Sequence, residues 1–130
     1  IQQNERLSTM VSRKVETFHD LVVWQKSHEL TMELFNVKLS KKETESLANQ
    51  IRTAAAAIPS NIAIGFKKRG KKPKLHYYRQ ALNAVQELEY LLLLANDLKL
   101  LKTHETMAQE LESIEHMLKR LIRSNSPQQP

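Results

Sequence analysis

Cysteine is absent from this chain of 130 residues, and glycine and proline are scarce, with two and four copies. Without cysteine there is no disulfide, no cysteine-ligated zinc site and no thiol nucleophile. So few turn-forming residues, beside plentiful leucine, alanine, lysine and glutamate, are typical of long helices. The sequence therefore predicts an all-α fold, and its length suits one domain with a single core.

Long apolar runs are also lacking. Purely apolar runs such as Leu91 to Ala95 are far shorter than the ~20 residues that span a bilayer. The first residues carry no apolar core of a signal peptide. We therefore expect a cytoplasmic protein with no membrane partner. Its net charge of +6 favours an anionic partner, with nucleic acid ahead of a membrane surface.

Apolar residues recur every three or four positions in four segments, which is the period of an amphipathic helix. Asp20 and Thr103 suit N-caps, and Ser40 with Glu43 forms a capping-box pattern. Short connections between helices imply antiparallel neighbours, hence an up-down-up-down four-helix bundle. We expect this bundle at residues 18–123, between a flexible arm at 1–17 and a disordered tail at 124–130. The predicted helices are Asp20 to Asn36, Lys41 to Phe66, Pro73 to Leu98, and one that follows Thr103.

The second predicted helix contains four consecutive alanines, Ala54 to Ala57, which make a narrow stem that neighbouring helices can approach closely. Pro59 follows, and proline removes one backbone donor inside a helix. We predict one bent helix here, the alternative being two short helices joined at Pro59. Ser60 and Asn61 are interpreted as donors to the carbonyls that the proline leaves unpaired, rather than as catalytic groups. Gly65 suits the C-terminal end of this helix.

Leucines point around most of the third helix at Leu91 to Leu94, because successive residues are about 100° apart. This segment either runs through the centre of the bundle or meets another subunit. We favour self-association, with these leucines and the alanine stem at the subunit contacts. Trp24, the only tryptophan, is interpreted as a core anchor rather than a ligand-stacking residue.

Motifs of catalysis are missing. There is no glycine-rich phosphate loop, no His-Glu-x-x-His zinc motif and no nucleophile elbow. The five histidines are scattered, and only Glu112, Glu115 and His116 approach the repeated Glu-x-x-His pairs of di-metal bundles. We predict a protein that is not an enzyme and has no metal, cofactor or small-molecule substrate.

The strongest functional signal is a run of seven cations within thirteen residues, with Tyr77 and Tyr78 beside it as possible stacking surfaces. Lysine and arginine that neutralise phosphates give salt-dependent binding largely without sequence choice. Such a run is equally compatible with plain solvated surface. The cations near the end of the last helix, Lys119, Arg120 and Arg123, also suit the helix dipole. The predicted nucleic-acid-binding residues are Lys67, Lys68, Arg69, Lys71, Lys72, Lys74 and Arg79.

Four motifs in order add a family resemblance. They are Phe18-x-Asp20-Leu21-x-Val23-Trp24-Gln25-Lys26, Leu47-x-x-Gln50-Ile51-Arg52, Ile58-Pro59-Ser60-Asn61-Ile62-Ala63-x-Gly65-Phe66, and Glu87-Leu88-Glu89-Tyr90-Leu91 continuing to Ala95. Together they resemble the bacterial four-helix-bundle proteins encoded in intervening sequences of large-subunit ribosomal RNA genes. The chain departs from the family pattern at Ile64, where glutamate is usual, and at Lys38-Leu39-Ser40, where the family has Phe-Pro.

The resemblance implies a barrel-like homopentamer. The accessory variability proteins of diversity-generating retroelements are similar in fold, and they bind nucleic acid and a reverse transcriptase through a basic surface. We therefore predict a non-enzymatic, oligomeric protein that binds RNA or DNA as an accessory factor, with a retroelement reverse transcriptase as a partner. The alternative is a scaffold that recruits an acidic protein without nucleic acid. A third hypothesis, an enzyme using Ser60, Asn61 or the histidines, ranks last.

Overall fold

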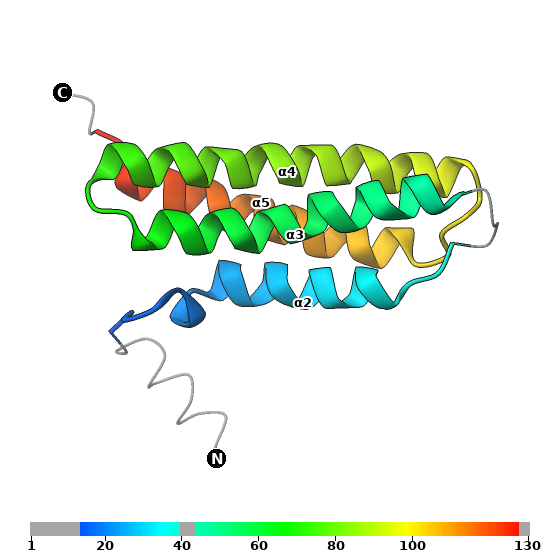
Figure 1. Cartoon of the computed structure of the whole chain (residues 1–130), viewed down its shortest axis with the longest axis horizontal. Helices are drawn as coiled ribbons and strands as arrows, with labels where there is room; N and C mark the ends of the chain where they lie inside the picture. Colours follow the sequence, from blue (N-terminus) through cyan, green and yellow to red (C-terminus); the bar gives the residue numbers. More distant parts are fainter. Residues whose placement is uncertain (1–13, 40–43, 128–130) are drawn as a thin grey trace, which may run out of the picture.

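The computed structural model describes residues 14–39 and 44–127. No strand occurs within these ranges, so the all-α prediction is confirmed. One turn of 3-10 helix, η1 (Phe18–Asp20), precedes four α-helices (Figure 1). The helices are α2 (Val22–Asn36), α3 (Glu45–Lys67), α4 (Lys71–Asp97) and α5 (His104–Asn125).

The four helices pack around one core. Each helix packs against the next along the chain, and α5 packs back against α2, so that α2 lies diagonally opposite α4. The α2–α3 and α4–α5 connections lie at one end of the bundle, and the α3–α4 connection lies at the other (Figure 1). Each helix supplies the core with a side chain that is at most 1% exposed, as predicted from the apolar spacing: Leu30, Ile62, Leu88 and Leu118.

The start of the first helix differs from the prediction. Asp20 lies in η1, and α2 begins at Val22. The Asp20 carboxylate accepts hydrogen bonds from the backbone N–H groups of Glu16 (3.0 Å) and Thr17 (3.1 Å). Asp20 therefore closes the turn before α2 and is not the N-cap of that helix, because its oxygen faces the preceding amides.

The other helix ends lie close to their predicted positions. The predicted capping box at Ser40 and Glu43 falls outside the described residues. Thr103 is the N-cap of α5, as predicted, although its hydroxyl points to the Met107 sulfur (3.6 Å) and makes no cap hydrogen bond with the backbone. At its C-terminal end α5 continues to Asn125, two residues into the predicted tail.

Helix α3 runs without a break through Pro59, so the alternative of two short helices is wrong. The carbonyl oxygen of Ala55 loses its helical donor to the proline, and the hydroxyl of Thr31 in α2 donates to it at 3.1 Å. The Asn61 amide instead donates to the carbonyl oxygen of Ala57 at 2.8 Å, and Ser60 is exposed. The predicted donors were therefore wrong, because the replacement comes from a neighbouring helix.

Gly65 has a packing role and not the predicted capping role. It lies inside α3 and is buried. A Cβ atom at this position would lie 2.7 Å from Cε1 of Tyr78 and 3.1 Å from Cβ of Tyr77. Only glycine lets α4 come this close, and the resulting burial raises the pKa of the Tyr78 hydroxyl.

The leucine run divides between the core and the surface. Leu91 and Leu92 are 5% and 1% exposed, whereas Leu93 is 45% exposed. In the alanine stem, Ala54 and Ala55 are buried in the same core. The predicted subunit contacts are therefore wrong for these four buried residues, because the protomer's own helices already cover them.

Candidate nucleic-acid interface

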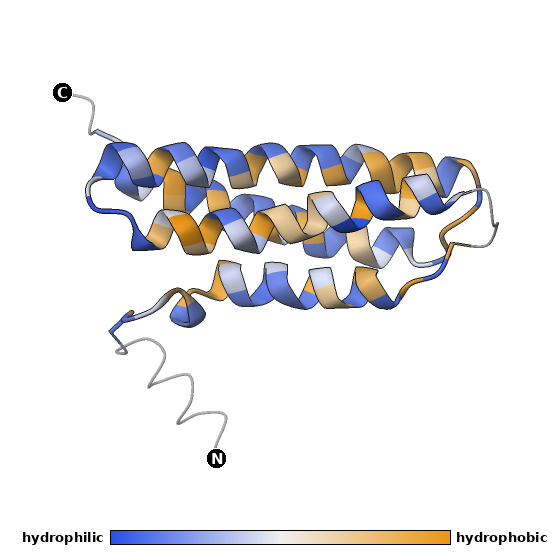
Figure 2. Cartoon of the chain, in the orientation of Figure 1, coloured by the Kyte–Doolittle hydropathy of each residue, from blue (hydrophilic) through white to orange (hydrophobic). Residues whose placement is uncertain are grey.

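Six of the seven predicted cations lie at the end of the bundle that carries the α3–α4 connection, and Arg79 lies about two turns further along α4. Lys67 is the last residue of α3, the connection is only residues 68–70, and Lys71 begins α4. The predicted helices leave residues 67–72 as the connection, so the observed connection is shorter, and Lys67, Lys71 and Lys72 lie in helices. Figure 2 shows hydrophilic residues along this connection and into the start of α4. We call the seven residues the cationic surface: Lys67, Lys68, Arg69, Lys71, Lys72, Lys74 and Arg79.

Besides Lys74, two cations of this surface lie over aromatic rings. The Lys67 ammonium lies 5.3 Å from the centroid of the Phe18 ring, and the Lys68 ammonium lies 5.3 Å from the centroid of Tyr77. Both lysines remain exposed. A cation over an aromatic face gains about 0.5–1 kcal/mol at an exposed site. These contacts orient the two side chains without neutralising their charge.

Lys74 differs from the other six because its ammonium group completes the C-terminus of α3. It donates to the carbonyl oxygens of Phe66 (2.5 Å) and Gly65 (3.3 Å), and it lies 5.2 Å from the centroid of the Phe66 ring. Partial burial lowers the pKa of Lys74. The structure thus gives Lys74 a helix-capping contact, and its place in the cationic surface is secondary.

Arg69, Lys71 and Lys72 are exposed, and their side chains take part in no hydrogen bond, ion pair or ring contact within the described ranges. Lys71 and Lys72 lie in the first turn of α4, where the helix dipole is positive and disfavours cations. Gly70, at φ 85°, is the N-cap and provides no side-chain acceptor for the first amides. Helix electrostatics therefore oppose the cations at this position.

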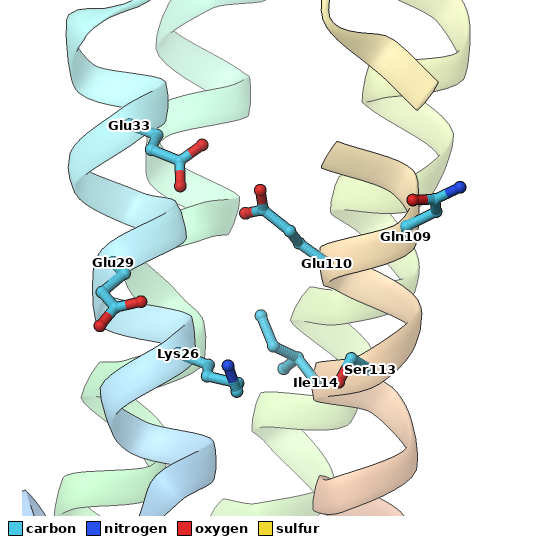
Figure 3. Close-up of a pocket in the computed structure, with 7 residues that line it drawn as sticks. All are labelled: Lys26, Glu29, Glu33, Gln109, Glu110, Ser113 and Ile114. Carbon is cyan, nitrogen blue, oxygen red and sulfur yellow. The ribbon is translucent and has the colours of Figure 1, made fainter. Parts of the chain in front are cut away.

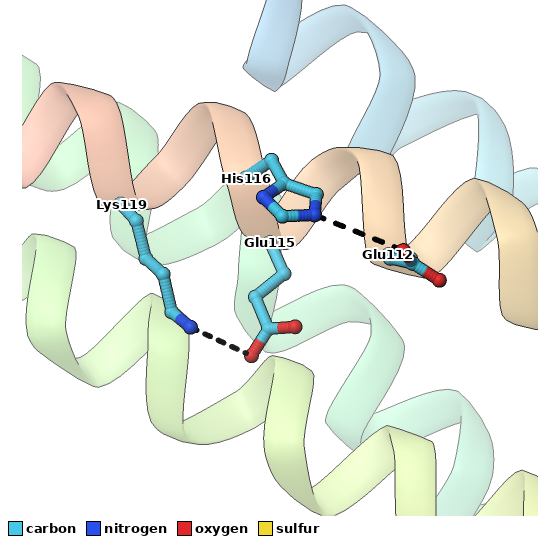
Figure 4. A network of polar contacts seen from close by, with 4 residues as sticks. All are labelled: Glu112, Glu115, His116 and Lys119. Atoms are coloured by element: carbon cyan, nitrogen blue, oxygen red, sulfur yellow. Dashed lines mark ion pairs between the residues drawn. The ribbon is translucent and has the colours of Figure 1, made fainter.

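The end of α5 lies at the same end of the bundle and adds further positive charge (Figure 1). Here the cations match the negative end of the helix dipole, with Arg123 in the last turn. Lys119 pairs with Glu115 at 3.6 Å, and His116 lies 3.7 Å from Glu112 (Figure 4). Stabilisation of α5 therefore accounts for these cations without a ligand.

Of the two predicted stacking tyrosines, only Tyr77 reaches the surface. Tyr77 is half-buried beneath Lys68, and the ring of His76 packs edge-on against it at 4.9 Å. Tyr78 is 2% exposed and fills the space beside Gly65. The prediction that Tyr78 could stack with a ligand is wrong, because its ring belongs to the core. Phe18, which lies beneath Lys67, was not predicted.

Negative charge collects in a different place, in a groove between α2 and α5. The groove has a volume of about 400 Å³, and Glu29, Glu33 and Glu110 line it. Figure 3 shows Glu33 and Glu110 extending toward each other from the two helices. Desolvation raises the pKa of Glu110, the charges of Glu33 and Glu29 and a hydrogen bond with Glu33 raise it further, and Lys26 opposes the rise. The acidic groove and the cationic surface thus separate the two signs of charge on the protein.

Metal-binding clusters and membrane-spanning helices are both absent from residues 14–39 and 44–127. No group of three histidine or carboxylate side chains there is placed to hold a metal ion. None of the helices combines the length and apolar character that crossing a bilayer requires.

Comparison with known proteins decides the family. The model of the family described as 23S rRNA-intervening sequence protein matches residues 19–120. The chain belongs to this family. The match covers all four helices except the last turn of α5, and it confirms the resemblance seen in the four motifs.

A solved structure agrees with the fold of this intervening-sequence protein. It is the crystal structure of a protein with unknown function from the S23 ribosomal protein family, from Bacteroides thetaiotaomicron. The two chains are 21% identical, with a TM-score of 0.70, over 78% of this chain and 96% of the other. At this identity the likeness shows a shared fold. The chain matches none of the curated proteins.

Proposed function

We propose that this intervening-sequence protein binds the phosphate backbone of RNA or DNA through the cationic surface and catalyses no reaction. The observation that carries the proposal is the position of Arg69, Lys71 and Lys72. They are exposed, they have no carboxylate partner in the described part of the chain, and two of them lie at a helix N-terminus. A bound phosphate would relieve their mutual repulsion and would suit the positive end of α4.

Folding stability does not explain why Lys71 and Lys72 are cations. A cation in the first turn of a helix costs about 0.3–1 kcal/mol, and a missing ion pair leaves that cost uncompensated. By contrast, Lys67 and Arg123 lie in the last turns of their helices, where the dipole favours them. The Lys74 ammonium, although it extends from the first turn of α4, reaches the C-terminal carbonyls of α3. A ligand with several phosphates supplies the missing anions, and its release of counterions makes binding strong at low salt.

We further propose that the protein forms a homo-oligomer, with the antiparallel bundle as protomer and the homopentameric barrel implied by the resemblance. Two exposed apolar pairs support it: Met32 and Phe35 on α2, which are 55% and 53% exposed, and Tyr90 and Leu93 on α4, which are 59% and 45% exposed. The two helices lie diagonally across the bundle. Two unlike faces on opposite sides favour head-to-tail contacts, which close into rings. A ring repeats the cationic surface and increases avidity.

Light scattering tests the assembly. Phe35→Lys and Leu93→Lys each place a charge on one of the two apolar faces, so each variant should have a lower molar mass than the wild type. Ser46→Lys, at an exposed position of α3, is the control and should keep the mass of the wild type. A wild type that stays monomeric at all concentrations contradicts the proposed oligomer.

In this role the oligomer would serve as an accessory factor to a nucleic-acid enzyme. The partner implied by the resemblance is the reverse transcriptase of a diversity-generating retroelement. The reasoning is that a basic ring without catalytic groups can hold an RNA or DNA strand while another protein performs the chemistry on it. Retention of purified reverse transcriptase by the immobilised protein, with and without nuclease, measures that contact directly.

Two matched triple variants test the nucleic-acid interface. In the first, Arg69, Lys71 and Lys72 are replaced by alanine. In the second, three exposed cations at the opposite end of the bundle are removed by Lys38→Ala, Lys99→Asn and Lys102→Ala. Asparagine is chosen for Lys99 because that residue has a φ of 61°. Both variants lose the same charge, so equal losses of affinity in filter binding would refute the assignment, and loss in the first alone would support it.

The scaffold that recruits an acidic protein is the second proposal, because the same cations fit carboxylates. Nuclease treatment before co-purification separates the two. A protein partner that remains bound after nuclease, together with no affinity of the pure protein for RNA or DNA, would favour the scaffold. Loss of all bound material after nuclease favours the nucleic-acid proposal.

A further inference from the structure

Four aromatic rings cluster where η1 meets α2. Phe18 and His19 stack at 4.2 Å between centroids, and both pack edge-on against Trp24, at 5.0 and 5.1 Å. The ring of His28, one turn further along α2, lies parallel to Trp24 at 4.8 Å with an interplanar angle of 10°. The rings differ in burial. Trp24 packs against the core, whereas His19 and His28 are exposed.

Hydrogen bonds hold this cluster in place. The Asp20 carboxylate closes η1 by accepting from the amides of Glu16 and Thr17. The side-chain amide of Gln25 in α2 donates to the carbonyl oxygen of His19 at 2.7 Å. Because the turn is tied both to itself and to α2, the rings are preorganised and a ligand would not need to order them.

The cluster adjoins the cationic surface. The Lys67 ammonium lies 5.3 Å from the centroid of the Phe18 ring, so the two sets of residues share a contact. Figure 1 shows η1 and the α3–α4 connection at the same end of the bundle. A nucleotide whose phosphate is bound at Lys67 would therefore have its base within reach of the rings.

Core packing explains only the inner half of the cluster. Trp24 packs against the core, as a core anchor should, and Phe18 is half-buried beside it. The exposed rings of His19 and His28 cover no core, and His28 contacts only Trp24 among the described aromatic rings. Flat exposed rings beside a groove of cations are the usual means by which proteins hold unpaired bases.

We propose that an unpaired nucleobase stacks on the histidine rings of this cluster while its neighbouring phosphates bind Lys67 and the rest of the cationic surface. The inference rests on the proposed nucleic-acid binding and adds a preference for single strands. Bases in a duplex are paired and stacked on one another, so their faces cannot reach the cluster. Phosphate contacts alone would not distinguish a strand with bases from one without.

The experiment uses the single tryptophan as its probe. A short single-stranded DNA is compared with an abasic strand that has the same number of phosphates, and with the duplex, by titration while Trp24 fluorescence is recorded. Stacking on this scale is worth about 1–3 kcal/mol per base, so the normal strand should bind about fivefold or more tightly than the abasic strand. Only the normal strand should change the Trp24 emission.

Variants assign the effect to the cluster. His28→Ala should lower the affinity for the normal strand toward that for the abasic strand, and it should leave the affinity for the abasic strand unchanged. His28→Phe keeps a flat ring and should restore the difference. His116→Ala, at an exposed histidine on α5, is the control and should behave as the wild type. Helical circular dichroism confirms that each variant is folded.

The outcomes separate this inference from the proposed function. Equal, salt-dependent affinity for normal and abasic strands overturns stacking and leaves phosphate binding intact. Equal losses in His28→Ala and His116→Ala also overturn stacking at this cluster. Failure of every strand to bind at low salt refutes the proposed function, and the stacking site with it.

Discussion

Removal of the Thr31 hydroxyl is the sharpest test of how the bundle tolerates Pro59. The carbonyl oxygen of Ala55 lacks a helical donor because of the proline, and Thr31 supplies one at 3.1 Å from α2. The same hydroxyl also donates to the carbonyl oxygen of Ser27 at 2.7 Å, so its one hydrogen is shared between the two oxygens. Ser27 has its ordinary helical partner as well, so only the Ala55 oxygen depends on this hydroxyl. Thr31→Val keeps the side-chain shape and leaves the Ala55 oxygen without a donor.

A buried acceptor without a partner costs about 1–3 kcal/mol. Because Thr31 is only half-buried, we expect Thr31→Val to lower the free energy of unfolding by about 1–2 kcal/mol. The assay is urea denaturation followed by helical circular dichroism, with an unchanged slope m. Thr31→Ser keeps the hydroxyl and serves as the control.

A double-mutant cycle isolates the proposed contact. Pro59→Ala returns an N–H group to the Ala55 oxygen, so in that background Thr31→Val should cost less than half as much. The coupling energy should be about 1 kcal/mol. An equal cost of Thr31→Val in both backgrounds would refute the reasoning, because the hydroxyl would then act on something other than the carbonyl that Pro59 leaves unpaired.

Three further predictions concern packing, pH and charge. Gly65→Ala should lower Tm, because strain of about 1–3 kcal/mol against the Tyr78 ring, 2.7 Å from the new Cβ, outweighs the better helix propensity of alanine; a higher Tm would contradict it. Glu110→Gln should raise the free energy of unfolding at neutral pH by roughly a few tenths of a kcal/mol, because solvent screens the repulsion, and Tm should rise with it. The raised pKa means that the stability Glu110 contributes at acid pH is lost as the pH rises above about 4.5, so the advantage of the variant should vanish at lower pH; an advantage that is the same at every pH would contradict it. Lys71→Glu with Lys72→Glu should stabilise the protein by about 0.3–1 kcal/mol per site yet weaken nucleic-acid binding, whereas a loss of both stability and binding would contradict the argument from the helix dipole.

The helices and the core were predictable from the sequence because they depend on local spacing. Apolar residues at intervals of three and four marked the buried faces, and Leu30, Ile62, Leu88 and Leu118 all lie at the centre of the core. The family was recognisable from the same stretches, because its motifs follow the core positions. Helix ends were within a few residues, which is the usual precision for patterns of this kind.

Contacts between distant segments were not predictable in this way. Thr31 and Ala55 are 24 positions apart, and nothing in the local pattern pairs them. Gly65 was assigned to a helix end because glycine is common there, although its reason lies in the approach of Tyr78 from another helix. Leu91 and Leu93 look alike in the sequence, and only the packing of the bundle shows which one is covered.

The candidate site was predicted as a set of charges and not as a geometry. The sequence predicted the run of cations from Lys67 to Arg79. It did not predict that the Lys74 ammonium would donate to the carbonyl oxygen of Phe66 at the C-terminus of α3. The aromatic cluster had a local signal, since Trp24 and His28 are one helical turn apart. That signal was missed because a lone tryptophan was interpreted only as a core anchor.

The salt dependence of binding tests the central claim most directly. Each neutralised phosphate contributes about −0.9 to the slope of log K against log salt concentration on duplex DNA. We expect a steep negative slope for the wild type, a slope smaller by about 3 when Arg69, Lys71 and Lys72 are alanine, and no change in the opposite-end variant. A slope near zero, or the same slope in all three proteins, would contradict the account.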